Sequence, residues 1–279
     1  MSGRSSPRVS ESRELPPDFA ALDANLVESL REATRWQRGA RLYEGDGLLI
    51  AHGSTNFPVG LSNAAARLDP AVPAAEVLAR ARAHFEGEGR LFTLWVRGAP
   101  DADLEAAAES AKLLPVSPVP SPWMVLRKRL PDPAPPRGVR VELVRDESQI
   151  RDVVVVSQAA WAPAGLPPAE TASLLSRADR MLAPHLVWSL AWQDGRPAAC
   201  AMALCSHGVA GIYWVGTVPD ARRRGLAEIA TRAAGNAGFD RGMRVAALQA
   251  SAMGYPVYQR MGYETVASTR WYLARPTRR

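Results

Sequence analysis

The residues best suited to chemistry form a basic turn in the second half of the chain. Arg222-Arg223-Arg224-Gly225-Leu226-Ala227 follows an apolar run, Ile212 to Val218, and precedes a helix with an apolar face that ends near Gly238. The first N–H groups of a helix lack internal partners and carry the positive end of its dipole. Glycine lets a phosphate approach the backbone, and arginine forks onto its oxygens. The stretch from 216 to 242 therefore predicts an anion site; the alternative is a solvated basic turn before a surface helix.

A second stretch follows the next apolar strand, which we expect at Val245 to Ala250. It contains Ser251 and the motif Tyr258-Gln259-Arg260-Met261-Gly262-Tyr263. In this order the two motifs resemble those of the GNAT superfamily of acyl-CoA-dependent N-acyltransferases. The family's pyrophosphate loop reads Arg/Gln-x-x-Gly-x-Gly/Ala, and Arg222 takes its first position. Arg223 stands where many members have Gly, so the turn is less open here.

The resemblance implies acetyl-CoA as co-substrate, with no metal. The pantetheine arm is expected along Gly216, Thr217 and Val218, like an added strand, and an N–H group there stabilises the oxyanion. The backbone from 223 to 227, with Arg222 or Arg224, is expected to hold the pyrophosphate. The predicted cofactor-binding residues are Gly216, Thr217, Val218, Arg222, Arg223, Arg224, Gly225, Leu226, Ala227 and Ser251.

Tyr258 is the catalytic candidate that the resemblance implies, because a phenol can protonate the thiolate leaving group. A tyrosine on an amphipathic helix is otherwise a packing residue. Tyr255 and Tyr263 are the alternatives for the acid if the register differs. Ser251 either bonds the cofactor or caps the next turn.

A general base is missing from the strand before the loop. Residues 210–218 contain no carboxylate, and Tyr213 and Trp214 stand there instead. They either shape an acceptor pocket or pack within the sheet. The four histidines show neither the spacing of a metal site nor that of a catalytic triad.

Two classes of function fit these motifs. The first is an N-acetyltransferase that moves an acetyl group from acetyl-CoA to a small-molecule or peptide amine. The second is a non-catalytic acyl-CoA-binding or regulatory module. The net charge of +6 and pI of about 9.8 suit an anionic substrate. Nucleic acid is not an expected partner, because the arginines are scattered apart from one cluster at 222–224.

Composition indicates a globular chain. Hydrophobic residues make up 47% of the 279 and charged residues 22%. Basicity rests on arginine, with lysine only at 112 and 128, which suggests a GC-rich bacterial genome. Cys200 and Cys205 lie on one expected strand with opposite-facing side chains, so they are expected to be free thiols. No signal sequence or membrane-spanning run is apparent, and we expect a cytoplasmic protein without membrane association.

The proline-rich run at 131–137 divides the chain. We expect a mobile tail at 1–17, a first domain at 18–130 and a catalytic GNAT domain at 138–279. The elements expected in the first domain are a helix at 18–38, strands at 42–43, 48–52, 91–96 and 123–126, and helices at 73–86 and 101–113, the last capped by Asp101. Residues 53–70 are expected to be a loop with at most a short strand.

In the second domain we expect the order β-α-α-β-β-β-α-β-α-β-β, which is that of the GNAT fold. The expected strands are 139–144, 186–192, 197–205, 210–218, 245–250, 263–266 and 269–274, and the expected helices include 147–161 and 168–182. Asp194-Gly195 predicts a two-residue hairpin turn.

A faint internal repeat links the halves. Phe92 to Val96, a helix and Trp123 to Leu126 recur roughly 150 positions later as Ala246 to Ala250, a helix and Arg270 to Leu273. The fold class is therefore α/β (a mixed sheet), with a degenerate GNAT-like N-terminal domain that lacks the arginine loop and the tyrosine. One acyl-CoA per chain is the consequence.

Overall fold

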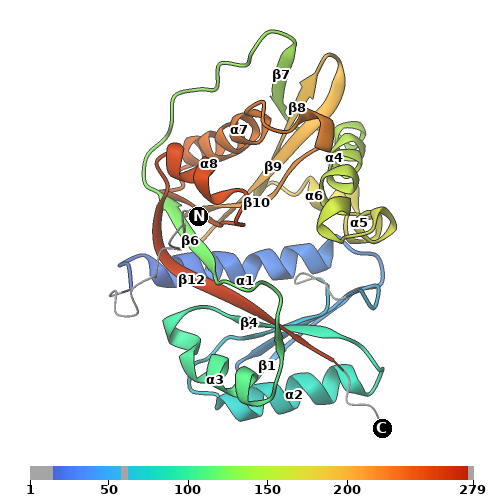
Figure 1. Ribbon diagram of the computed structural model, residues 1–279, viewed down its shortest axis with the longest axis vertical. Coiled ribbons are helices and arrows are strands. Elements are labelled where there is room, and N and C mark those ends of the chain that lie inside the picture. The colour runs from blue at the N-terminus through green and yellow to red at the C-terminus, as the bar shows by residue number, and fades with distance from the viewer. Residues whose placement is uncertain (1–14, 58–61, 276–279) are drawn as a thin grey trace, which may run out of the picture.

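A mixed sheet of twelve strands runs through the whole molecule (Figure 1). The structure is a computed structural model that describes residues 15–57 and 62–275. The path through the sheet is β1-β2-β3-β4-β12-β6-β11-β10-β9-β8-β7, with the short β5 beside β12. The expected tail at 1–17 lies mostly outside the described residues, as does 58–61 of the expected loop at 53–70.

The first half has helices on both faces of its part of the sheet. One apolar cluster joins α1 to strands β2, β3 and β4, and another joins α2 and α3 to the same strands. The elements are α1 (Phe19–Arg35), β1 (Arg41–Gly45), β2 (Leu48–His52), β3 (Ala64–Arg67), α2 (Ala74–Glu86), β4 (Phe92–Val96), η1 (Ala99–Asp101), α3 (Ala102–Ser110), β5 (Leu114–Pro115) and β6 (Ser121–Leu126).

The second half is layered in the same way. Alternate residues of β8 and β9 face α4, as Trp188 and Met202 do, while Val187 and Ala203 face α7. The elements are β7 (Val139–Leu143), α4 (Glu147–Trp161), η2 (Ala162–Ala164), α5 (Pro168–Leu174), α6 (Ala178–Met181), β8 (Leu186–Gln193), β9 (Arg196–Ser206), β10 (Val209–Thr217), η3 (Pro219–Ala221), α7 (Leu226–Asp240), β11 (Val245–Gln249), α8 (Tyr255–Arg260) and β12 (Glu264–Ala274).

Local chemistry explains several of these elements. Asp194 and Gly195 both have positive φ, at 50° and 78°, as the tight turn between β8 and β9 requires. Asp146 caps α4 by accepting a hydrogen bond from the Gln149 N–H at 3.0 Å. A Cβ at Gly238 would lie 2.5 Å from the Ala210 Cβ, so this glycine lets α7 lie close to β10. Cys200 and Cys205 are free and belong to clusters on opposite faces of β9.

The two halves exchange their last strands. β6, from the first half, lies between β11 and β12; residues 123–126 pair with β11, and residues 121–125 pair with β12. β12 pairs with β6 through 264–269 and then with β4 through 270–274 (Figure 1). A register shift between Thr265 and Ala267 accompanies this path. The proline-rich run at 131–137 therefore separates the halves along the chain, but one sheet contains strands of both halves. The domain bounds stay a prediction.

The internal repeat reappears in the strand pairing. β3 and β4 are parallel over three residue pairs from Ala64↔Thr93 to Ala66↔Trp95, and β10 and β11 are parallel over three pairs from Val209↔Val245 to Gly211↔Ala247. In each half a helix follows the first strand of this pair, and a shorter helix follows the second. The exchanged strands β12 and β6 then lie beside β4 and β11 respectively.

Helix α1 joins the halves at their seam, where it lies across the middle of the molecule (Figure 1). Its buried Asn25 donates from Nδ2 to the Leu204 carbonyl at 3.0 Å and to the Ser206 hydroxyl at 2.8 Å. Tyr213 of β10 donates to the other atom of the same amide, Asn25 Oδ1, at 2.9 Å. A helix of the first half is thus hydrogen-bonded to the strand that precedes the basic turn.

Two sequence expectations about the bounds of elements need correction. The strands expected at 263–266 and 269–274 are one strand, β12, because a bulge bends the chain without ending it. The helix expected at 168–182 is two helices, since Arg177 leaves helical geometry (φ −119°, ψ 82°). Ser176, between the two helices, donates to the Trp36 carbonyl at 3.3 Å and accepts from the Arg38 N–H at 3.0 Å.

The expected cap of α3 also differs from the structure. Asp101 stands at the N-cap position, but its side chain makes no capping bond. Its carboxylate is fully buried and accepts from Arg67 and Arg97. The helix ends at Ser110 rather than at Leu113. The short strand considered for residues 53–70 is present as β3.

Candidate acyl-CoA site

Strand β10 leaves its neighbour β11 part of the way along its length. The parallel ladder ends at Gly211↔Ala247, whereas β10 continues to Thr217. On the other side β10 stays paired with β9 as far as Thr217↔Ala199. Beyond Gly211, β10 therefore has no strand partner on the β11 side within the described residues, and the Thr217 carbonyl accepts from Arg222 Nε. An exposed strand edge of this kind can accept an extended group as an added strand.

A bulge changes the direction of β10 just before its end. Pairing with β9 jumps from Tyr213↔Met202 to Gly216↔Cys200, so Trp214 and Val215 oppose the single residue Ala201. Trp214 has a φ of 53° in the left-handed region. Its ring lies 6.2 Å from Trp36 and 6.4 Å from Trp161, measured between centroids. The bulge thus gathers aromatic side chains of α1, α4 and β10 beside the end of the strand.

The turn after β10 is built to leave backbone donors open. Arg223 and Gly225 have φ of 63° and 77°, and Gly225 is the N-cap of α7 without any side chain to cap it. The first bond that reaches back to the cap runs from Ile229 N–H to the Gly225 carbonyl. Nothing lies within 4 Å of a Cβ built on Gly225. This uncapped first turn of a fifteen-residue helix is a suitable anion site.

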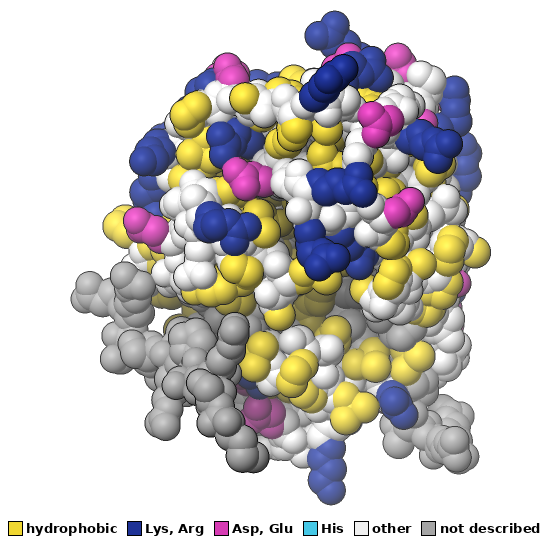
Figure 2. All heavy atoms as spheres, turned by 45° about the horizontal axis from the view of Figure 1, so that its top comes forward, with side chains coloured by type: hydrophobic (Ala, Val, Ile, Leu, Met, Phe, Trp, Pro, Cys, Tyr) yellow, Lys and Arg dark blue, Asp and Glu magenta, His cyan; other side chains and the backbone are white. Residues whose placement is uncertain are grey.

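The three arginines of the turn have different surroundings. Arg223 and Arg224 are exposed, whereas Arg222 is half-buried. Arg222 donates from Nη2 to the Ala160 carbonyl at 2.9 Å and from Nε to the Thr217 carbonyl at 3.3 Å. Its guanidinium therefore ties the end of β10 to the end of α4. Arg223 and Arg224 are the two arginines of the turn that face solvent. Figure 2 shows several basic side chains, with acidic ones between them, on the face turned forward.

Two buried polar atoms near the end of β10 lack partners. The Thr217 hydroxyl and the Trp161 indole N–H make no hydrogen bond within residues 15–57 and 62–275. A Cβ built on Gly216 would lie 3.6 Å from Trp161 Nε1, which places this donor against β10. An unpaired buried polar group costs about 1–3 kcal/mol. These two groups are therefore suited to a ligand that lies along the strand.

Tyr258 is buried on α8, with 8% of its surface exposed. Burial raises the pKa of its hydroxyl to about 12, and the hydroxyl of Thr231 on α7 acts in the opposite direction. Its ring lies 5.8 Å from that of Tyr263, whose pKa burial also raises. A Cβ on Gly254 would lie 2.8 Å from Tyr258 Cε2, so a larger residue at position 254 would clash with the Tyr258 ring.

The other residues considered for the site lie in the turns after β10 and β11. The Ser251 hydroxyl accepts from the Gly254 N–H at 3.1 Å, which is the capping bond considered from the sequence. Tyr255 accepts at its hydroxyl from Gln259 at 3.0 Å. At the start of α7, Leu226 is buried in an apolar cluster, so it can contribute only its backbone to a ligand. Ala227, the next residue, is half-buried.

Sequence reasoning missed Glu170 of α5. Its Oε2 atom is buried and has no hydrogen-bond partner in the described part of the chain. Helix α5 packs against α4, where Gln158 donates to the Pro168 carbonyl at 3.0 Å, and Trp161 lies one turn further along α4. No local pattern singles out Glu170, because an acidic residue in the first turn of a helix is common.

Sites of other kinds find no support in the residues that the structure describes. They contain no group of three or more metal-ligating side chains arranged around a point. Within the same ranges, no helix combines the length and the apolar character that a membrane span requires. The basic turn and the end of β10 remain the candidate site.

Comparison with known proteins finds a family model that matches just under half of the chain. Residues 127–256 match the model of the Acetyltransferase (GNAT) domain. The chain carries a GNAT acetyltransferase domain. The match includes the arginine turn of this GNAT domain and ends two residues before Tyr258. No curated protein shows a significant match to the chain.

Solved structures extend the GNAT likeness over both halves. A GCN5-related N-acetyltransferase from Kribbella flavida superposes with a TM-score of 0.68 at 24% identity, covering 94% of this chain and 98% of its own. One from Sphaerobacter thermophilus gives 0.60 at 16% identity, covering 95% of each chain. A tandem GNAT protein from the clavulanic acid biosynthesis pathway gives 0.57 at 13% identity, covering 92% of this chain and 97% of its own. These likenesses concern the fold.

Proposed function

We propose that this protein transfers an acetyl group from acetyl-CoA to the amine of a small molecule or peptide. The observation that carries the proposal is the continuity of three features: the unpaired edge of β10, the arginine turn and the uncapped start of α7. Together they offer backbone donors for an extended arm and then a basic anion site for a pyrophosphate. The GNAT family match over this segment supports the same reading.

Acetyl-CoA would supply an activated thioester at the end of β10. In this proposal Arg223, Arg224 and the first N–H groups of α7 hold the pyrophosphate. Backbone groups from Gly216 to Val218 align the pantetheine arm. The arm would also form hydrogen bonds with the Thr217 hydroxyl and the Trp161 N–H, which lack partners within the described residues. Arg222 keeps the strand end and α4 together through two carbonyls.

Tyr258 is the proposed proton donor to the sulfur that leaves as the C–N bond forms and the C–S bond breaks. Because burial raises its pKa to about 12, the phenol stays protonated throughout the neutral range. It can therefore donate to sulfur at any pH at which the protein is expected to work.

Glu170 is the carboxylate that we propose for removing a proton from the amine. Its Oε2 atom is buried without a partner, and leaving a buried acceptor unpaired is unfavourable unless a ligand supplies the donor. Glu170→Gln should then lower acceptor-dependent turnover and weaken its pH dependence, while CoA affinity stays the same. An unchanged pH profile of kcat/KM would remove this role from Glu170.

The lack of any carboxylate on β10 favours one second candidate, an acyl-CoA-binding module without turnover. One experiment separates the two functions: free-thiol release from acetyl-CoA measured over a panel of amines, with CoA calorimetry on the same protein. Acceptor-dependent thiol release supports the transferase. CoA binding without such release supports the module, and absence of CoA binding contradicts both.

Tyr258→Phe tests the proton donor within the same assay. Removing a general acid lowers turnover by about 10²- to 10⁴-fold while the thioester is still bound. Tyr255→Phe is the matched control, because Tyr255 lies on the same short helix and its hydroxyl is engaged with Gln259. Equal turnover in the wild type and Tyr258→Phe would exclude the assignment.

A further inference from the structure

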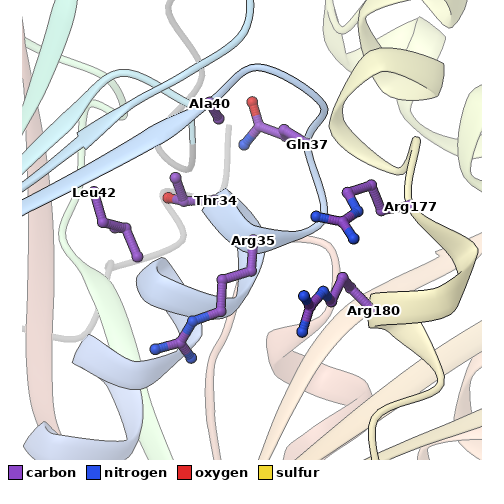
Figure 3. A pocket seen from close by; sticks show the side chains of 7 residues that line it. All are labelled: Thr34, Arg35, Gln37, Ala40, Leu42, Arg177 and Arg180. Atoms are coloured by element: carbon purple, nitrogen blue, oxygen red, sulfur yellow. The ribbon is translucent and has the colours of Figure 1, made fainter.

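A cavity of about 340 Å³ lies at the seam between the two halves, and no residue of the arginine turn lines it. One wall comes from the end of α1 and the start of β1, and the other comes from α6 and the residue before it (Figure 3). Three of its seven lining residues are arginines and none is acidic: Thr34, Arg35, Gln37, Ala40, Leu42, Arg177 and Arg180. The lining therefore offers hydrogen-bond donors with positive charge.

The α6 wall carries an excess of positive charge. Arg177 and Arg180 share one carboxylate, that of Asp179, at 2.8 and 3.7 Å. The Arg180 guanidinium makes no hydrogen bond to any residue in the described ranges, and Arg177 bonds Asp179 through Nε and Nη2 only. In Figure 3 both guanidinium groups extend from the α6 wall toward the end of α1. Several N–H donors thus remain for a ligand between the walls.

The α1 wall does not compete for these donors. Arg35 is neutralised by Glu28, at 2.7 Å, and by Glu32, and in Figure 3 its guanidinium points away from the α6 wall. The Thr34 hydroxyl donates to the Leu30 carbonyl at 2.8 Å. Gln37 donates to the Ala33 carbonyl at 2.8 Å and accepts from Ser54 through its oxygen. The Thr34 hydroxyl and the Gln37 amide thus have partners within the protein, and Arg35 is engaged with two carboxylates through Nη1.

We propose that this cavity binds the anionic oxygen group of a small organic anion, a phosphate or a carboxylate, held by Arg177 and Arg180. Arginine forks bind such groups bidentately, and two guanidiniums with one carboxylate between them leave one positive charge for the ligand. The anion fixes α6 against α1 in addition to the existing bonds of Ser176 to residues 36 and 38. The site is independent of acyl transfer and needs no CoA.

Calorimetric titration with inorganic phosphate and with citrate, at constant ionic strength set by chloride, tests the proposal. The wild type should bind at least one probe saturably, and tighter binding of phosphate or of citrate tells the two ligand chemistries apart. Arg177→Gln with Arg180→Gln should weaken that binding by at least about tenfold. Arg177→Lys with Arg180→Lys should recover part of it, because the charge returns without the planar fork.

Two control variants make the result decisive. Arg151→Gln removes an exposed arginine of α4 that does not line the cavity and should leave binding unchanged. Arg223→Gln with Arg224→Gln removes the other basic site at which phosphate can bind. Saturable binding that persists in the Arg177/Arg180 variant, or that disappears only in the Arg223/Arg224 variant, overturns the proposal, as does the absence of saturable binding in the wild type. Thermal unfolding of each variant shows that it is folded.

Discussion

The two parallel strand pairs of this molecule are paired in the same way but differ in the side chains that lie beyond their first strands. Three residue pairs join β3 to β4, and three join β10 to β11. In each pair a helix follows the first strand. The helices that follow β3 and β10 both start without a side-chain cap, but three arginines precede the start of α7, and the nearby Thr217 hydroxyl lacks a partner within the described residues. Beyond β3 lies a buried ion network in which Arg67, 1% exposed, bonds Asp101, which is fully buried.

The network occupies the end of the first strand pair with side chains of the protein itself. Arg67 donates to Asp101 at 2.9 Å and to Asp103 at 2.7 Å, and Arg97 donates to Asp101 and to Asp23 at 3.0 and 2.8 Å. The helix that follows β3 begins after Pro73 and carries Glu76 in its first turn, as α7 carries Glu228. The two helix starts therefore differ in the arginines that precede α7 and not in this acidic residue. This contrast between the two strand ends is the basis on which we propose a single acyl-CoA site, at the end of β10.

The largest expected effect comes from breaking the ion network. Asp101→Ala leaves two buried arginines without the carboxylate that they share, and should lower the free energy of unfolding by about 3–5 kcal/mol. Urea denaturation followed by tryptophan fluorescence measures it. Asp103→Ala is the matched control, because its side chain is 59% exposed and its loss should cost less than about 1 kcal/mol. Equal effects of the two substitutions would contradict the assigned role of the buried network.

Neutralising the exposed arginines of the α7 turn should have the next largest effect. Arg223→Gln with Arg224→Gln should weaken CoA binding by about 10- to 100-fold, the loss of roughly 1–3 kcal/mol of charge-assisted bonding. Calorimetry at fixed salt measures the change. The control lies in the other half: Glu76→Gln, in the first turn of α2, should leave CoA affinity as it was. Weaker CoA binding in the Glu76 variant would break the contrast between the halves.

Arg222 should behave differently from its neighbours. Arg222→Ala removes two bonds to backbone carbonyls, so the free energy of unfolding should fall by about 1–2 kcal/mol. CoA affinity should fall less than in the Arg223/Arg224 variant. The reverse pattern, with lost affinity and unchanged stability, would place Arg222 on the pyrophosphate.

The smallest effect is a pH dependence that differs between the halves. Burial lowers the pKa of His52 and His84, whose ring nitrogens lie 3.1 Å apart beside Glu88. The folded state favours the neutral rings, so their contribution to stability is present above pH 6.5 and is lost as the pH falls. In the second half, Tyr258 contributes stability below pH 10 that is lost as the pH rises through about 12. Urea denaturation midpoints measured across pH, with His52→Gln and His84→Gln for comparison, show the loss of stability below pH 6.5.

Local chemistry made part of this molecule predictable from its sequence. The Asp194-Gly195 turn, the free cysteines on opposite faces of β9, and a GNAT domain containing the arginine turn are confirmed. Each depends on residues close together in the chain, where spacing and backbone preference determine the outcome. The roles of the arginine turn and of Tyr258 remain predictions.

Long-range contacts account for what the sequence did not reveal. The exchange of β6 and β12 depends on pairing between strands about 140 positions apart, and nothing in either strand encodes its neighbour. The division of the helix expected at 168–182 involves Ser176, whose hydroxyl bonds to residues of the first half. Glu170 and Trp161 became visible only through their missing partners, a property of the folded chain.

The stoichiometry of CoA binding tests the contrast between the two strand pairs most directly. Calorimetric titration of the full chain should give one CoA per chain, since the end of the β3–β4 pair is filled and that of the β10–β11 pair is not. Binding should weaken in Arg223→Gln with Arg224→Gln and persist in Glu76→Gln. Two CoA molecules per chain, or none, would contradict this account.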